Sequence, residues 1–114
     1  MPQTVTNAEA REALQACENS LADAFEASTD LDEKTAIFKT MRAIHREIVA
    51  AVQAELRDAN GQYTSMTQDI GGAIGDLKKI QAKIDTIIVD TQRAAQVIAA
   101  IAKVLEIAAK VAAK

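Results

Sequence analysis

The sequence predicts an all-α protein, an up-and-down bundle of three helices in which a helical hairpin packs on a long C-terminal helix. The main observation is a seven-residue hydrophobic repeat that holds its phase from residue 70 to residue 114. An apolar residue every 3.5 positions keeps one seam of a helix facing its neighbours, which indicates coiled-coil-like packing. The seam consists of Leu77, Ile84, Thr91, Ile98, Leu105 and Ala112 at heptad position a, and Ala73, Ile80, Ile87, Ala94, Ile101 and Ala108 at position d.

Length and composition favour one helical domain over residues 1–114. Apolar residues make up 49 % of the chain and charged residues 25 %, a balance typical of folded domains. Aromatic residues contribute only 3 %, so the core has to be built from Ala, Ile, Leu, Val and Met. No run of residues alternates with a period of two between turn signals, and we therefore expect no β-strands.

The first helix is predicted over residues 7–27, after a flexible lead at residues 1–6. Thr6 and Glu9 have the spacing of a capping box, in which each side chain accepts a hydrogen bond from the other residue's backbone amide. An apolar stripe at helical spacing marks the face that packs on a neighbour. This stripe consists of Ala10, Leu14, Cys17, Leu21, Ala24 and Phe25.

The second helix is predicted over residues 31–59, antiparallel to the first. Asp30 and Glu33 place carboxylates at its start, where the helix dipole favours negative charge. We expect the helix to stop at Asn60-Gly61, with the glycine in the left-handed conformation. Its expected inner face consists of Ile37, Met41, Ile44, Ile48, Val52 and Leu56, widened by Phe38 and Val49.

The third helix is predicted over residues 64–113 as one continuous element. Gly71, Gly72 and Gly75 each cost a helix about 1 kcal/mol relative to alanine, but the apolar spacing stays in phase on both sides of this segment. A break within residues 71–75 is one alternative. The other is a break near Asp90, whose side chain can cap a fourth helix. The heptad passes Asp90 without glycine or proline, which favours continuity.

The chain offers no evident catalytic, metal or cofactor site. His45 is the only histidine, and it has no Glu three or four residues before it to complete the usual helical metal site. Cys17 lies within an apolar stripe, so we expect a buried thiol, and a nucleophilic pair with His45 would lack an orienting third group. We therefore predict a non-enzymatic protein without a cofactor.

Two loops resemble ligand-binding motifs but fail at their demanding positions. The stretch that begins Asp30-Leu31-Asp32 has Thr35 and Met41 where a calcium loop needs Gly and Glu. The glycines of residues 71–75 precede Lys78-Lys79, but the lysine spacing differs from that of a phosphate loop and no strand comes before it. We expect these glycines to serve close helix packing or a hinge.

Charge is distributed unevenly along the chain, whose formal net charge is −3. Residues 1–60 hold eleven acids and six bases, whereas residues 61–114 hold five acids and seven bases. Attraction between an acidic hairpin and a basic third helix explains this asymmetry within one fold. The bases are neither clustered nor interleaved with aromatic residues, so we predict no nucleic-acid binding. The first residues lack the features of a signal peptide, and we expect a cytoplasmic location, with signal-less export left open.

The third helix supplies the functional hypothesis, because it is too long for the hairpin. Residues 73–114 would span about 63 Å as one helix, against roughly 30 to 45 Å for each hairpin helix. Valines at position g and alanines at position e widen its apolar arc after residue 93, so one neighbouring helix cannot cover it. We therefore predict a protein-interaction function by self-association into a homo-oligomer. The expected interaction residues are Ile84, Ile87, Ile98, Ile101, Val104, Leu105 and Ala108.

Two alternatives remain for the partner that covers this apolar arc. A heterologous protein would make the chain an inhibitor, adaptor or chaperone-like partner. An anionic membrane surface is the other alternative, because a broad apolar face beside a lysine face is typical of interfacial helices. Lys103, Glu106 and Lys110 interrupt the apolar run well short of the twenty or so residues that span a bilayer.

Overall fold

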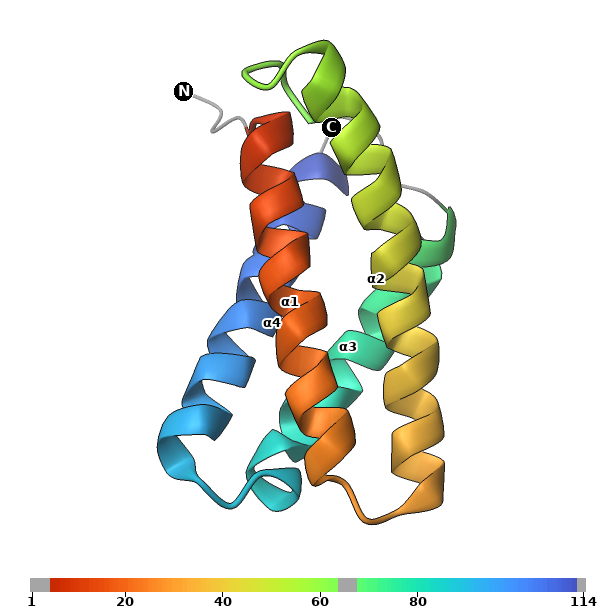
Figure 1. The fold of residues 1–114 in the computed structure, drawn as a ribbon, viewed down its shortest axis with the longest axis vertical. Coiled ribbons are helices and arrows are strands. Elements are labelled where there is room, and N and C mark those ends of the chain that lie inside the picture. Colours follow the sequence, from red (N-terminus) through yellow and green to blue (C-terminus); the bar gives the residue numbers. More distant parts are fainter. Residues whose placement is uncertain (1–4, 64–67, 113–114) are drawn as a thin grey trace.

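The described chain contains four helices, where the sequence predicted three. The computed structural model describes residues 5–63 and 68–112. Helix α1 spans Asn7–Ala27, α2 spans Leu31–Arg57, α3 spans Gln68–Ile87 and α4 spans Thr91–Ala112. Consecutive helices run in opposite directions, so the bundle is all-helical and up-and-down as predicted (Figure 1). The same residues form no β-strand, although an isolated β-bridge pairs Thr6 with Gln62.

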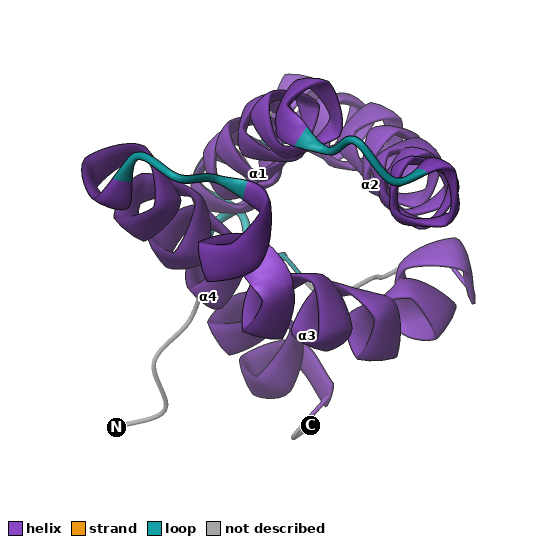
Figure 2. Ribbon diagram, turned by 90° about the horizontal axis from the view of Figure 1, so that it is seen from below, coloured by secondary structure: helices purple, strands orange, loops and turns teal. Residues whose placement is uncertain are grey.

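The four helices surround one core, as the end-on view shows (Figure 2). Helix α1 packs against α2 and α4, and α3 packs against the same two helices, whereas α1 and α3 meet only narrowly across the core. The bundle measures 41 × 24 × 22 Å. Each helix therefore has two main neighbours. The side chains that point between these two neighbours are the ones that are buried.

The prediction of one long third helix is wrong, because the chain turns back at residues 88–90. The amide of Ile88 closes the last turn of α3 on the carbonyl oxygen of Ile84, at 2.8 Å. The carboxylate of Asp90 caps α4 by accepting hydrogen bonds from two backbone amides of its first turn, at 2.9 and 3.2 Å. The break near Asp90, an alternative in the prediction, is the one that the chain adopts.

Burial explains this turn in the absence of glycine or proline. The C-terminal apolar face of a continuous helix would extend beyond the ends of α1 and α2. Because the chain turns back, this face packs against α1 instead. Burying a Val or Ile side chain contributes about 1.5–3 kcal/mol, so several such residues offset the cost of ordering a three-residue turn. The buried residues of α4 are Ala94, Val97, Ile101, Val104, Ile107 and Ala108.

The turn also changes which heptad positions face the core. In α3 the predicted a and d positions are buried from Ala73 to Ile87. In α4 the d positions stay buried, but Val97 and Val104 at position g take the place of position a. Ile98 and Leu105, at position a, are only partly buried. The chain itself therefore covers most of the apolar arc that suggested an oligomer.

Helix α3 continues through its glycines, as predicted, but these residues do not serve close packing. Gly71, Gly72 and Gly75 are exposed, and a Cβ atom added at any of them would meet nothing within 4 Å. The expectation of close helix packing at these positions is wrong. Positions 64–67 and 113 of the predicted third helix lie outside the described residues.

Helix α1 occupies the predicted range and begins with the predicted capping box. The amide of Glu9 donates to Thr6 Oγ1 at 3.1 Å, and the amide of Thr6 donates to Glu9 Oε1 at 3.4 Å. Val5 is buried, and its carbonyl oxygen accepts a hydrogen bond from the Tyr63 amide at 2.7 Å. The described end of the predicted flexible lead is therefore packed into the fold.

Helix α2 ends at Arg57, shortly before the predicted residue 59, and Gly61 does not take the left-handed conformation. Gly61 instead permits a close approach, because a Cβ atom there would lie 2.9 Å from Asp58 Oδ2. The carbonyl oxygen of Gly61 accepts a hydrogen bond from the Asn7 amide at 2.9 Å. The loop after α2 therefore satisfies backbone donors at the start of α1.

The buried face of α2 is rotated relative to the prediction. Phe38, Val49 and Leu56, expected on the inner face, are exposed, while Met41 and Val52 are partly buried. The rotation follows from the neighbours α1 and α3, which lie on either side of the buried positions. These positions are Ile37, Thr40, Ile44, Glu47, Ile48 and Ala51.

Candidate interaction surface

Cys17 and His45, the residues with nucleophilic or acid–base chemistry, do not form a site together. Cys17 is fully buried in α1, and burial, with a smaller effect of Glu18, raises the pKa of its thiol to about 12. The His45 ring is 64 % exposed on α2, and its Nδ1 atom lies 2.9 Å from Glu18 Oε2. A thiol that stays protonated in the core and an outward imidazole do not make a nucleophilic pair.

The first of the two motif-like loops has a structural role. Asp30 Oδ1 accepts hydrogen bonds from the amides of Asp32 and Glu33, at 2.8 and 3.2 Å, and so caps α2. No group of three or more His, Cys, Asp or Glu side chains in the described chain is arranged to hold a metal ion. Among the helices described for residues 5–63 and 68–112, none is long and apolar enough to cross a membrane.

The predicted interaction residues of α3 and α4 belong mainly to the chain's own core. Ile84, Ile87, Ile101, Val104 and Ala108 are buried. Ile98 and Leu105 pack against the core and are partly buried. The seven residues are thus brought together, but around the axis of the bundle and not on one free surface.

The exposed large apolar residues lie elsewhere, and most of them are on α2. Of the five in the described chain, four belong to α2: Leu31, 76 % exposed, Phe38, 46 %, Val49, 47 %, and Leu56, 82 %. The fifth is Val89 in the turn between α3 and α4, 91 % exposed. Isolated exposed apolar residues are ordinary, but four on one helix call for an explanation.

These four residues of α2 share one side of the helix with His45. The steps from Leu31 through Phe38, His45 and Val49 to Leu56 are 7, 7, 4 and 7 residues, each close to a whole number of helical turns. The five residues form a line that we call the outward stripe. It runs about 38 Å along α2 at 1.5 Å per residue.

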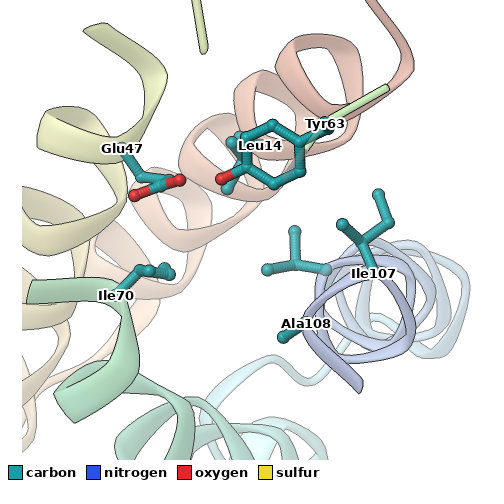
Figure 3. Close-up of a pocket in the computed structure, with 7 residues that line it drawn as sticks. Leu14, Glu47, Tyr63, Ile70, Ile107 and Ala108 are labelled. Carbon is teal, nitrogen blue, oxygen red and sulfur yellow. The ribbon is translucent and has the colours of Figure 1, made fainter. Parts of the chain in front are cut away.

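The opposite side of α2 buries two polar residues. Thr40 is covered and its hydroxyl donates to the carbonyl oxygen of Ala36 at 3.0 Å. Glu47 is 0 % exposed and lines a small cavity of about 10 Å³. Figure 3 shows its carboxylate near Ile70, with the hydroxyl end of the Tyr63 ring directed toward it. Sequence reasoning missed Glu47, although its spacing of three residues from Ile44 places it on the buried side.

Two hollows flank the exposed side of α2. The first, of about 420 Å³, lies on the α1 side and is lined by Phe38, Met41 and His45. The second, of about 270 Å³, lies between α2 and α3. Arg42 and Arg46 line both hollows and therefore lie between them.

Comparison with known proteins supplies no functional assignment. No protein-family model matches the chain, and no curated protein or solved structure matches it significantly. A functional proposal therefore depends on the geometry of the described residues, and the exposed side of α2 is the most unusual part of that geometry.

Proposed function

We propose that the chain is a non-enzymatic protein-interaction module that binds a partner through the outward stripe of α2. The observation that carries the proposal is that this helix exposes Phe38, Val49 and Leu56 on one side, while its mostly apolar buried side also holds Thr40 and Glu47. Burying a carboxylate in place of an apolar side chain costs stability. A partner that covers the stripe would explain why large apolar residues lie on the outside.

Contacts between α1 and α2 hold the outward stripe in place. Arg11 of α1 and Glu55 of α2 form a two-pronged ion pair, with Nε and one terminal nitrogen 3.0 and 3.2 Å from the two carboxylate oxygens. The ring of Phe38 packs against the ring of Phe25, with the centroids 6.3 Å apart. An aromatic anchor held in this way loses little side-chain freedom on binding.

Self-association through the C-terminal helix, the first expectation from the sequence, stays a prediction. It depended on an uncovered apolar face, and α1 and α3 cover most of that face within one chain. The second expectation, a heterologous protein partner, agrees better with an exposed stripe on a different helix. We therefore favour the heterologous partner.

Site-specific photo-crosslinking in cells that produce the protein tests this function. A benzophenone amino acid is placed singly at Phe38, at Leu56 and, as the control, at Val89, which is also apolar and is more exposed than either. We expect the same protein to be crosslinked from Phe38 and from Leu56 but not from Val89, and Val49→Asp to abolish both crosslinks. Equal yields at all three positions, or none at Phe38 and Leu56, would refute the proposal.

A further inference from the structure

The exposed side of α2 is basic as well as apolar. Lys39, Arg42 and Arg46 are exposed beside the outward stripe, in a chain whose formal net charge is −3. Of the four acids in the same helix, Glu47 is buried, Glu55 is paired with α1, and Asp32 and Glu33 lie in the first turn. The middle of the stripe is therefore flanked on α2 by exposed bases and by no exposed acid, which favours acidic partners.

Arg42 is placed to receive a carboxylate. Arg42 and Arg46 are four residues apart, one turn of α2, and both line the 420 Å³ hollow that contains Phe38 and Met41. Arg42 forms no ion pair within the described chain. A guanidinium group binds a carboxylate through two parallel hydrogen bonds. An apolar side chain that enters this hollow would therefore bring a neighbouring acid within reach of the Arg42 guanidinium group.

A second copy of the chain does not complement this surface. Two outward stripes packed face to face would bring Arg42 and Arg46 toward the same residues of the other copy, and like charges at an interface repel. Helix α1 presents the exposed acids Glu9 and Glu12. However, none of the exposed large apolar residues of the described chain belongs to α1.

A flat lipid surface also fits less well than a protein helix. Phe38 and Val49 are only about half exposed, so they do not project far enough for deep insertion. A partner that enters a hollow suits these side chains better than a planar partner.

We infer that the outward stripe docks an acidic amphipathic helix of another protein. Large apolar side chains on one side of that helix cover the stripe and fill the hollow beside Phe38. Carboxylates that flank them pair with Lys39 and Arg42. This inference rests on the proposed function and adds the chemistry of the partner. A stripe of about 38 Å accepts a helix of up to about seven turns.

Selection from a displayed library of helical peptides tests this inference, with the complete chain as the target. The peptides are roughly 20 residues long, about 30 Å as a helix, and their surface positions are randomised for charge and size. We expect the enriched peptides to carry net negative charge and to have large apolar residues spaced three or four positions apart. NMR shift changes should map their binding to the outward stripe.

Variants of the chain separate the apolar and charged contributions to binding. Phe38→Ser should weaken binding of the enriched peptide about tenfold or more, and Arg42→Gln about threefold to fivefold. Higher salt should weaken binding further. Arg42→Glu should favour a version of the peptide in which lysine replaces glutamate. Val89→Ser, the matched control, should leave binding unchanged.

Each outcome of the selection supports or overturns a stated claim. Neutral or basic peptides that bind at the outward stripe would overturn the inference and leave the proposed function standing. Peptides that bind elsewhere, or no enriched peptide at all, would overturn both. Flotation with vesicles that contain phosphatidylserine is run in parallel. If the vesicles bind, Phe38→Ser abolishes that binding and no peptide binds, then the partner is a membrane and not an acidic helix.

Discussion

Burial in the core, more than the neighbouring carboxylate of Glu18, raises the pKa of the Cys17 thiol. The thiol has an ordinary pKa of 9.0, and desolvation raises the pKa to about 12 in the folded chain. Because the folded pKa is the higher one, this stabilising contribution is complete below about pH 9 and is lost as the pH rises toward 12. The sequence context, between Leu14 and Leu21, was sufficient to predict the burial but not its depth.

A pH series of urea unfolding measures this contribution. We predict that Cys17 lowers the free energy of unfolding by up to about 1.4 kcal/mol per pH unit above pH 9. Cys17→Ala should remove that part of the slope, so that the wild-type and variant curves converge or cross as the pH rises. Parallel curves for the two proteins would show that the thiol ionises equally in both states.

Glu47 and Thr40 show why single residues of α2 were assigned to the wrong side. Both are polar and were not considered for the core, whereas Leu56 is apolar and was placed there. Burial depends on the direction toward α1 and α3, which no local pattern within α2 specifies. The apolar residues of α2 occur on both sides of the helix, so hydrophobic periodicity could not choose between them.

At the scale of one helix, the glycines of α3 give a direct test of the packing. A Cβ atom at Gly71, Gly72 or Gly75 would meet no neighbour within 4 Å, and alanine disfavours the unfolded chain relative to glycine. We predict that Gly71→Ala, Gly72→Ala and Gly75→Ala each raise the free energy of unfolding by about 0.5–1 kcal/mol. Urea unfolding followed by circular dichroism measures the change.

Gly61→Ala is the matched control, and its expected effect has the opposite sign. A Cβ atom there would lie 2.9 Å from Asp58 Oδ2 and 3.2 Å from Asn7 Nδ2. The side chains of Asp58 and of the buried Asn7 have to shift to accept it, so stability should fall. Stabilisation by Gly61→Ala, or destabilisation by the three α3 substitutions, would contradict the packing described for these elements.

The two tight turns of the bundle explain which helix boundaries the sequence could predict. Asp30 and Asp90 make the same pair of capping hydrogen bonds at the end of three-residue connections. The first connection, Ser28-Thr29-Asp30, is polar and was recognised. The second, Ile88-Val89-Asp90, is apolar and leaves the heptad in phase, so local signals favoured continuity. Only the length of the neighbouring helices argues for the second turn.

At the scale of the whole molecule, charge substitutions distinguish a core seam from an oligomer seam. Ile101 is 0 % exposed and Leu56 is 82 % exposed. We predict that Ile101→Asp costs at least about 3 kcal/mol, because it buries an unpaired carboxylate, and that Leu56→Asp changes stability by less than about 0.5 kcal/mol. Thermal unfolding of both variants measures this. If Ile101→Asp gave a stable monomer from a wild-type oligomer, the α4 seam would be an interface.

Helix content and most helix ends follow from the sequence because capping and periodicity are local properties. The capping box of Thr6 and Glu9 and the start of α2 at Asp30 are examples. The candidate surface does not follow from the sequence, because it consists of the residues that remain exposed once the four helices have packed together. Phe38 and Leu56 became candidates only when the position of α1 and α3 around α2 was known.

The central claim is that one chain covers its own apolar seam, which leaves the outward stripe of α2 as the surface for a partner. Small-angle X-ray scattering over a concentration series tests it most directly, because it reports mass and shape together. We predict a particle of 12.2 kDa at all concentrations, with a radius of gyration near the 13.9 Å of the Cα atoms. A mass that doubles with concentration, or an elongated particle with an unbroken third helix, would contradict it.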